Sequence, residues 1–399
     1  MRTVYTASIL ALGCNLVSGL DEFAVPATAS GSGGGQAATS SASGGSTPAP
    51  CVLGVATHRH QSCARLADGS VWCWGDNTVG QLGDGTGVSS PVPVRARDLP
   101  RIRDVVTAGT SVFALGEDGR VYAWGGNGAG QLGMGHTGAL LSPQPIASLT
   151  NIARMAAGRA HACAIDIRDN LYCWGSNQFG QIASGTPAAL QPVLIMMGIR
   201  AVAAGGMHTC ALDINGRVIC WGSNAYAQLG SPSNVTGTPT QVDGMLLAVE
   251  VAASGLLTCA RSTGDRIYCW GYNAFGQAGD VAAGQTINSP REVSGVRAPV
   301  GLAVSGRRAC ALTDSEGVWC WGELGVSSPQ SPAPVNVSAP KRMEILDGAV
   351  AIGLASYHAC VLFPDGLGCI GAGTFGELGH GALETTSGFV RPALPCNAR

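Results

Sequence analysis

The sequence predicts an all-β fold, a seven-bladed β-propeller of four-stranded blades with a disordered N-terminal stalk. Three observations predict it. A Trp-Gly dipeptide recurs six times at intervals of 47 to 51 residues, and an Ile-Gly dipeptide takes the seventh place. Each repeat contains short apolar runs separated by turn residues. The 59 glycines, the 21 prolines and the charged fraction of only 12% fit many short strands better than long helices. The repeats are centred on Trp74, Trp124, Trp174, Trp221, Trp270, Trp321 and Ile370.

The first 50 residues differ in composition from the repeats. Residues 1–14 have the layout of an export signal, with a positive charge at Arg2 and an apolar stretch that ends at Cys14. This end resembles the lipobox of bacterial lipoproteins, which makes Cys14 the predicted lipidation site. Cleavage near Ala29 is the alternative. Residues 15–50 form a Gly/Ser/Ala-rich linker that we expect to be flexible, because such a composition cannot bury enough apolar surface to order itself.

Each repeat of about 50 residues carries four strand signals. In residues 202–230, a run of small residues is followed by two apolar runs around an Asn215-Gly216 turn, which is typical of a hairpin. A later segment with proline, such as Pro91 to Val94 or Pro239 to Val242, is expected as the outermost strand, because a sheet edge tolerates proline. Four strands repeated seven times predict a propeller over residues 51–396.

The repeat resembles that of a known family. The pattern A-A-G-x-x-H-[TA]-C-A-[LI], followed by W-G-x-N-x-x-G-Q-L-G, is similar to the repeat of the regulator of chromosome condensation family. The resemblance extends over residues 51–396 and implies a seven-bladed propeller. The sixth repeat is shortened to WGELG at Trp321, and we expect this deletion to open a notch in the rim.

Cysteines occur in pairs, 9 or 10 residues apart, in six of the repeats. The second repeat has Phe113 and Ala123 in the two places, so both members are absent together, as expected of a bonded pair. Each pair brackets a hairpin turn, and its members should therefore face each other and form a disulfide. Zinc binding by the thiolates with a nearby histidine is the alternative. The predicted pairs are Cys63 and Cys73, Cys163 and Cys173, Cys210 and Cys220, Cys259 and Cys269, Cys310 and Cys320, and Cys360 and Cys369.

Three cysteines lie outside these pairs. Cys51 precedes the first strand of the first repeat, and Cys396 follows the last strand of the seventh. A closed ring brings both to one seam, so we predict that they form a disulfide. Cys14 then remains for lipidation. We expect no metal and no cofactor.

Two sets of side chains are candidates for a binding rim. The resemblance implies that the Gly-x-x-His position, occupied by His161, His208 and His358, lies near the centre of one face, where histidines of eukaryotic members engage a small GTPase. A hydrogen bond to a neighbouring blade is the alternative. Large aromatic residues at a rim are frequent interface anchors, although their repetition also fits a wedge between blades. The aromatic candidates are Phe179, Tyr226, Tyr272, Phe275 and Phe375.

Charge and motifs limit the function. The 23 basic and 25 acidic residues give a formal charge of -2, with no basic block to neutralise phosphates, so we expect no nucleic-acid partner. Fifteen cysteines favour an oxidising compartment, so we expect an exported protein in the cell envelope or outside the cell. Hydrolase, phosphate-loop and zinc-protease motifs are absent from the sequence. Acids such as Glu323 and Glu377 stand isolated.

The sequence therefore predicts a non-enzymatic, monomeric binding protein. Its loop face should bind a protein or a cell-envelope component, and its only expected membrane contact is the lipid anchor. Two alternatives stay open. The family resemblance implies guanine nucleotide exchange as in eukaryotic members. A propeller-based polysaccharide lyase or hydrolase would need clustered acids or a metal at the central channel.

Overall fold

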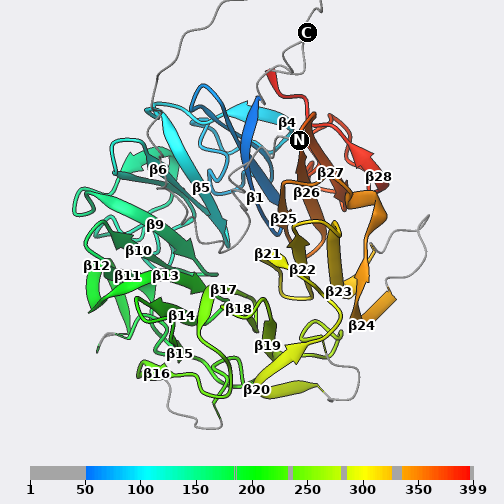
Figure 1. Ribbon diagram of the computed structural model, residues 1–399. Coiled ribbons are helices and arrows are strands. Elements are labelled where there is room, and N and C mark those ends of the chain that lie inside the picture. Colours follow the sequence, from blue (N-terminus) through cyan, green and yellow to red (C-terminus); the bar gives the residue numbers. More distant parts are fainter. Residues whose placement is uncertain are drawn as a thin grey trace, which may run out of the picture.

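The computed structural model describes residues 51–183, 185, 187–231, 237–279, 285–325 and 335–395. The predicted export signal, the linker and Cys396 lie outside these residues. Within them, the chain forms seven antiparallel sheets of four strands each, and Figure 1 shows these sheets as blades arranged in a ring. The predicted seven-bladed propeller is confirmed. No helix in this part of the chain is long and apolar enough to cross a membrane.

Every blade consists of four consecutive strands, of which the first lies nearest the centre of the ring. Blades 1 and 2 comprise β1 (Val52–His58), β2 (Gln61–Leu66), β3 (Val71–Gly75), β4 (Ser90–Arg95), β5 (Ile102–Ala108), β6 (Ser111–Gly116), β7 (Val121–Gly125) and β8 (Leu140–Pro145). Blades 3 and 4 comprise β9 (Ile152–Ala157), β10 (His161–Asp166), β11 (Asn170–Ser176), β12 (Ala188–Met197), β13 (Ile199–Ala204), β14 (His208–Asp213), β15 (Val218–Gly222) and β16 (Thr240–Gln241).

The remaining three blades continue in the same order, with one short 3-10 helix, η1 (Glu344–Leu346), between blades 6 and 7. Blades 5 and 6 comprise β17 (Ala248–Ser254), β18 (Leu257–Ser262), β19 (Ile267–Tyr272), β20 (Thr286–Val293), β21 (Pro299–Val304), β22 (Arg308–Thr313), β23 (Val318–Leu324) and β24 (Val335–Arg342). Blade 7 comprises β25 (Ala351–Leu354), β26 (His358–Phe363), β27 (Gly366–Gly371) and β28 (Thr386–Val390).

Side-chain size and polarity follow the position of each strand in its blade. The innermost strands are rich in alanine and valine, because only small side chains fit where seven sheets converge. The second strands are almost wholly buried. The fourth strands are largely exposed. Of the two prolines predicted on these strands, Pro91 lies in β4, whereas Pro239 directly precedes the short strand β16. An edge strand tolerates proline because one side of it has no ladder partner.

The six predicted cysteine pairs inside the repeats form disulfides. In each pair the two residues lie opposite each other on the second and third strands, with Cα atoms 4.0 to 4.1 Å apart. The zinc alternative is therefore wrong, because these sulfurs are bonded to each other. Cys51 is also disulfide-bonded. Its predicted partner, Cys396, lies outside the described residues, so that pairing stays a prediction. So many disulfides indicate an oxidising compartment.

A recurring contact links five of the blades to the preceding blade through the tryptophan of the Trp-Gly dipeptide. All six indoles are fully buried. In these five blades the indole Nε1 donates a hydrogen bond to a backbone carbonyl in the Gly-Gln-Leu-Gly-like tetrad of the preceding blade, which for Trp74 is blade 7, across the seam. The bonds run from Trp74 to Glu377 (2.7 Å), Trp124 to Gln81 (3.0 Å), Trp174 to Gln131 (2.7 Å), Trp221 to Gln181 (2.9 Å) and Trp270 to Gln228 (2.9 Å).

The last residue of the tetrad makes room for this indole. Gly83 has a left-handed backbone with a φ of 70°, and a Cβ on it would lie 2.7 Å from Nε1 of Trp124. The same atom on Gly133 would lie 2.9 Å from Nε1 of Trp174. Because real Cβ atoms do not approach a neighbour so closely, glycine at these two positions makes room for the next tryptophan. Blade 3 has Ala183 in this place, with a φ of 49°.

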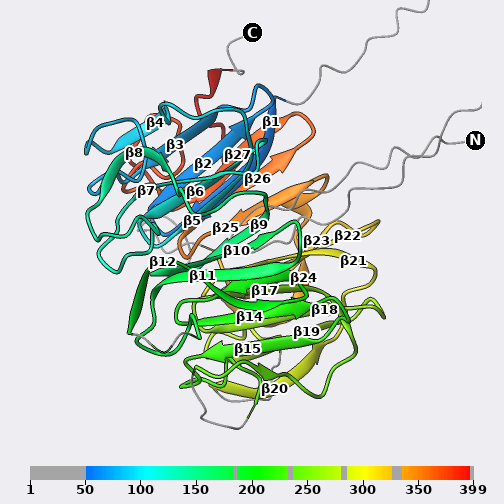
Figure 2. The same cartoon turned by 90° about the vertical axis from the view of Figure 1, so that its left-hand side faces the viewer.

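The ring closes at the seam between blades 1 and 7 without sharing a strand, since β1–β4 and β25–β28 form separate sheets. Strand β1 instead lies against β25 and β26, as Figures 1 and 2 show. The seam is held by side-chain packing, by the Trp74 hydrogen bond and by one apolar cluster drawn from both blades. This cluster includes Val52, Val55, Leu66, Trp74, Ala351, Leu362, Leu367, Leu378 and Leu394.

Blade 6 departs from this pattern. Among the described residues, Nε1 of Trp321 has no hydrogen-bond partner although the indole is fully buried. The loop that was expected to form a notch runs from the end of β23 to the start of β24. Most of it, residues 326–334, lies outside the described residues. The notch therefore stays a prediction.

Replacing tryptophan with phenylalanine separates the hydrogen bond from the packing. Trp174→Phe removes the donor and leaves the buried Gln131 carbonyl without it, which costs about 1–3 kcal/mol beyond the loss of volume. Trp321→Phe loses similar volume but no hydrogen bond. We expect Trp174→Phe to lower the free energy of unfolding more than Trp321→Phe, as measured by denaturant titration. Equal losses would show that the bond contributes nothing.

Candidate protein-binding face

The strand order gives the ring two different faces. In an antiparallel blade, the connection from the first to the second strand and the connection from the third to the fourth lie at the same end. All of these connections therefore gather on one face, which we call the loop face. The predicted rim aromatics and the predicted histidines all lie on or next to these connections.

The three predicted histidines do not belong to an exposed rim. His161, His208 and His358 are at most 1% exposed. In each case Nε2 lies within hydrogen-bond distance of a hydroxyl on the next blade. The pairs are His161 and Thr209 (2.9 Å), His208 and Thr258 (2.8 Å), and His358 and Ser62 (2.8 Å). The binding role expected from the family resemblance is wrong for these side chains, and the alternative of a blade-to-blade hydrogen bond is confirmed.

The hydroxyl fixes the protonation of its histidine. Thr258 Oγ1 donates its proton to the Gln228 carbonyl at 2.9 Å, and Trp270 donates to the same carbonyl. The hydroxyl therefore accepts from Nε2–H of His208. Burial lowers the pKa of His208 to about 3 and that of His161 to about 4. These rings are thus neutral donors that extend the tryptophan contact.

Three of the predicted aromatics are exposed rather than wedged between blades. Phe179, Tyr226 and Phe375 are 41%, 40% and 46% exposed. Their loops are held by the tetrad: the side-chain oxygen of Gln228 accepts the backbone N–H of Tyr226 at 2.9 Å. In blade 7, Glu377 takes this place and accepts the backbone N–H of Phe375 at 2.8 Å. The tetrad therefore fixes the position of each rim aromatic.

Most of these aromatics join one connected surface, which we call the aromatic arc. Tyr226 packs edge-on against Tyr272 with ring centroids 5.1 Å apart, and Tyr272 packs in the same way on Phe275 at 6.1 Å. The guanidinium of Arg307 lies 4.9 Å from the centroid of Phe275 and 5.7 Å from that of Tyr357. The arc thus continues from blade 4 through blade 5 to blades 6 and 7.

The arc ends at the seam. The His60 ring of blade 1 stacks on Tyr357 at 5.9 Å and contacts Phe375 at 4.3 Å between centroids. Phe179 shares no ring contact with another aromatic of the described chain. The arc therefore comprises Tyr226, Tyr272, Phe275, Arg307, Tyr357, His60 and Phe375.

Two acids that seemed isolated in sequence hold the polar members of the arc. Glu323 of β23 accepts from Arg307 Nη1 at 2.8 Å, and the side chain of Glu377, 0% exposed, lies 3.0 Å from Nδ1 of His60. Sequence reasoning did not identify His60, Arg307 or Tyr357. All three occupy the position three residues before the first member of the repeat's Cys pair, but no residue type recurs there, so the repeat pattern gives no signal.

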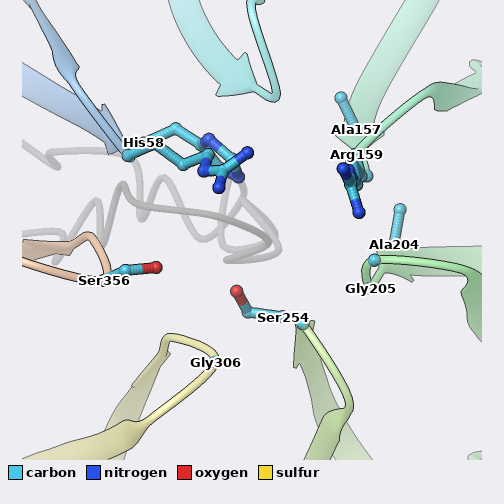
Figure 3. A pocket seen from close by; sticks show the side chains of 12 residues that line it. His58, Ala157, Arg159, Ala204, Gly205, Ser254, Gly306 and Ser356 are labelled. Carbon is cyan, nitrogen blue, oxygen red and sulfur yellow. The ribbon is translucent and has the colours of Figure 1, made fainter.

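Inside the arc the loop face opens into a central cavity of about 210 Å³. Figure 3 shows side chains of His58, Arg159, Ser254 and Ser356 around this opening. The first-to-second strand turns of several blades line it. It shares those turns with the arc, since Ser356 directly precedes Tyr357.

The fold and its recurring repeat define a seven-bladed repeat propeller. The chain belongs to the regulator of chromosome condensation (RCC1) repeat family, as the resemblance indicated. One model of that repeat matches residues 68–115, 118–165, 168–212 and 215–261, and a second matches residues 152–181, 199–228 and 248–277. No curated protein matches the chain significantly by sequence.

Solved structures share the fold. Prp20p of Saccharomyces cerevisiae superposes with a TM-score of 0.73 and 21% identity, over 82% of this chain and 86% of the other. Human WBSCR16 gives 0.70 and 22%, over 82% and 95%. The ectodomain of the Physcomitrella patens receptor kinase CR4 gives 0.50 and 19%, over 80% and 74%.

The buried histidines predict a pH-dependent stability. Between about pH 6.5 and pH 4, the unfolded chain takes up protons at these rings while the folded chain does not, so acidification lowers the free energy of unfolding. Asp104 acts in the opposite direction, since burial raises its pKa to about 6. His208→Gln keeps a donor but removes one titrating ring. We expect the variant to reduce the slope of the free energy of unfolding against pH by up to about 1.4 kcal/mol per pH unit.

The measurement is denaturant unfolding at several pH values between 7 and 4.5. Because Asp104 is present in both proteins, the difference between their slopes reports His208 alone. An unchanged slope in the variant would contradict the neutral, buried histidine.

Proposed function

We propose that this protein is a non-enzymatic, monomeric scaffold that binds another protein through the aromatic arc of its loop face. The observation that carries the proposal is the connected, partly exposed arc itself. Tyrosine and arginine are enriched among residues that dominate binding energy at interfaces. The tetrad and the ion pairs hold the arc in place before any partner arrives, which lowers the entropy lost on binding.

Known relatives of the same fold support a protein partner. Prp20p has described binding properties towards Gsp1p and histones, and yeast RCC1 (Prp20) has been solved bound to Kap60. The alternative of guanine nucleotide exchange has no support from the histidines that suggested it, because they are buried. No particular observation favours a polysaccharide lyase or hydrolase.

The proposed place of action is the cell envelope, with the partner a protein or an envelope component. The six disulfides support an exported chain. Cys14, at the end of a lipobox-like segment, is the proposed lipid anchor, and residues 15–50 would serve as a stalk between membrane and propeller.

The partner is tested by crosslinking in the native host with the full chain carrying an affinity tag. Phe275→Ala and Phe375→Ala should each weaken capture by about 2 kcal/mol, or roughly thirtyfold, without changing the thermal midpoint. Phe179→Ala is the matched control, since Phe179 has the same repeat position and a similar exposure but lies outside the arc. Capture that survives both arc variants, or that Phe179→Ala abolishes equally, would contradict this role of the arc.

Anchoring is tested by Cys14→Ser. Without the acceptor thiol no lipid can be attached, so the variant should leave the membrane fraction or remain as the unprocessed precursor. Fractionation and the mass of the mature chain report both outcomes. Unchanged membrane association with normal processing would rule out lipidation at Cys14.

A further inference from the structure

The central cavity holds cationic side chains without counter-charges. Its lining includes Arg59 and Arg159, on the inner turns of blades 1 and 3, together with His58, and none of its lining residues is acidic. Neither guanidinium forms an ion pair or a side-chain hydrogen bond with the described chain. Arginines elsewhere in this propeller are commonly paired, as Arg261 is with Glu250 at 2.9 Å. Two unpaired arginines at one opening leave ten N–H donors unused.

Glycines keep further large side chains out of this opening. At the position of Arg59 and Arg159, blades 4, 5 and 6 carry Gly206, Gly255 and Gly306. A Cβ on Gly255 would lie 2.8 Å from Cα of Gly306. At this position these three blades therefore bring no side chain into the opening, and the arginines of blades 1 and 3 lie across it from backbone. Figure 3 shows the Ser254 and Ser356 hydroxyls directed into the same opening.

Arg59 also adopts a backbone that its position does not favour. Its φ is 39°, in the left-handed region, where the equivalent Gly109 and Gly255 both have a φ of 58°. Residues that carry a Cβ are strained in this region. Glycine would remove the strain, so an arginine here indicates a use for its side chain.

The local field is positive as well. Burial, the largest cause, together with Arg59 and Arg159 lowers the pKa of His58 to about 4. The backbone N–H of Gly109 donates to His58 Nε2 at 3.5 Å, so the neutral ring carries its proton on Nδ1. Both guanidiniums and the hydroxyls of Ser254 and Ser356 can donate a hydrogen bond into the opening, and none of the described residues that line it is acidic.

We propose that this cavity, which we call the arginine cavity, binds a carboxylate on an acidic segment of the protein partner, between Arg59 and Arg159. The planar guanidinium fork matches the two oxygens of a carboxylate. The arc borders the cavity, because Arg59 precedes His60 and Gly306 precedes Arg307. A peptide that places its carboxylate in the cavity therefore lies across the arc. This inference rests on the proposed function, since it names the chemistry of the same partner.

The test is calorimetric titration of the purified full chain with a blocked pentapeptide that carries three acidic side chains. Its amide counterpart, with glutamine and asparagine, and inorganic phosphate are the comparison probes. We expect binding of the acidic peptide only. Arg59→Gln and Arg159→Gln should each weaken it at least fivefold, and the double variant should abolish it. Arg168→Gln, which removes an exposed charge from the opposite face, should leave it unchanged.

A second variant separates binding from folding. Arg59→Gly removes the side chain and the backbone strain together, so it should weaken peptide binding while the thermal midpoint stays the same or rises. A double Gln variant that binds normally, equal binding of the amide peptide, or tighter binding of phosphate than of the acidic peptide would overturn the proposal.

The outcome is distinguishable from that of the proposed function. If the acidic peptide requires both arginines but arc variants leave cellular capture intact, the carboxylate site stands and the arc's role fails. If a captured partner depends on Phe275 and Phe375 but not on Arg59 and Arg159, the scaffold function stands and the carboxylate site is refuted.

Discussion

The hydrogen bond from a buried indole to a backbone carbonyl of the preceding blade is the interaction on which this propeller depends. It explains why the repeat pairs Trp-Gly with a Gly-Gln-Leu-Gly-like tetrad: the tetrad's second residue supplies the carbonyl and its last glycine leaves space for the ring. Because Trp74 makes the same bond to Glu377, the ring closes by the contact that also joins blades 1 to 5 in sequence. The seam therefore needs no shared strand.

The same tetrad connects the stability of the ring to the proposed binding face. Its glutamine side chain fixes the loop that carries a rim aromatic, while its backbone carbonyl holds the next blade. A substitution in the tetrad would thus change both the blade contact and the surface. The arc is consequently built from side chains on rigid supports, although several come from loops, and this favours a partner that docks onto a preformed surface.

The features that could be predicted from the sequence are those formed by residues of a single repeat. Strand order and the six hairpin disulfides each depend on residues within one repeat. The arc could not be predicted in full, because His60, Arg307 and Tyr357 come from different blades and meet only when the ring closes. The arginine cavity could not be predicted for the same reason, because Arg59 and Arg159 come from different blades.

The sequence also contains a pattern that indicates the role of the buried histidines. Histidine occurs in repeats 3, 4 and 7. The repeats that follow these in the ring are 4, 5 and 1, and each has a hydroxyl residue directly before its first cysteine, namely Thr209, Thr258 and Ser62. The corresponding position in the other repeats carries alanine or valine. Comparing each repeat with its neighbour would have indicated a blade-to-blade hydrogen bond and excluded an exposed histidine rim.

The placement of the disulfides bears on how the chain is oxidised. Each of the six links residues only 9 or 10 apart, opposite each other in a hairpin. A hairpin forms in microseconds, far faster than thiols are oxidised. Every cysteine in these pairs can therefore meet its proper partner as soon as its own repeat is free to fold in an oxidising compartment. Blade by blade, oxidation can follow the order of synthesis, with little need for disulfide reshuffling among the many cysteines of the chain.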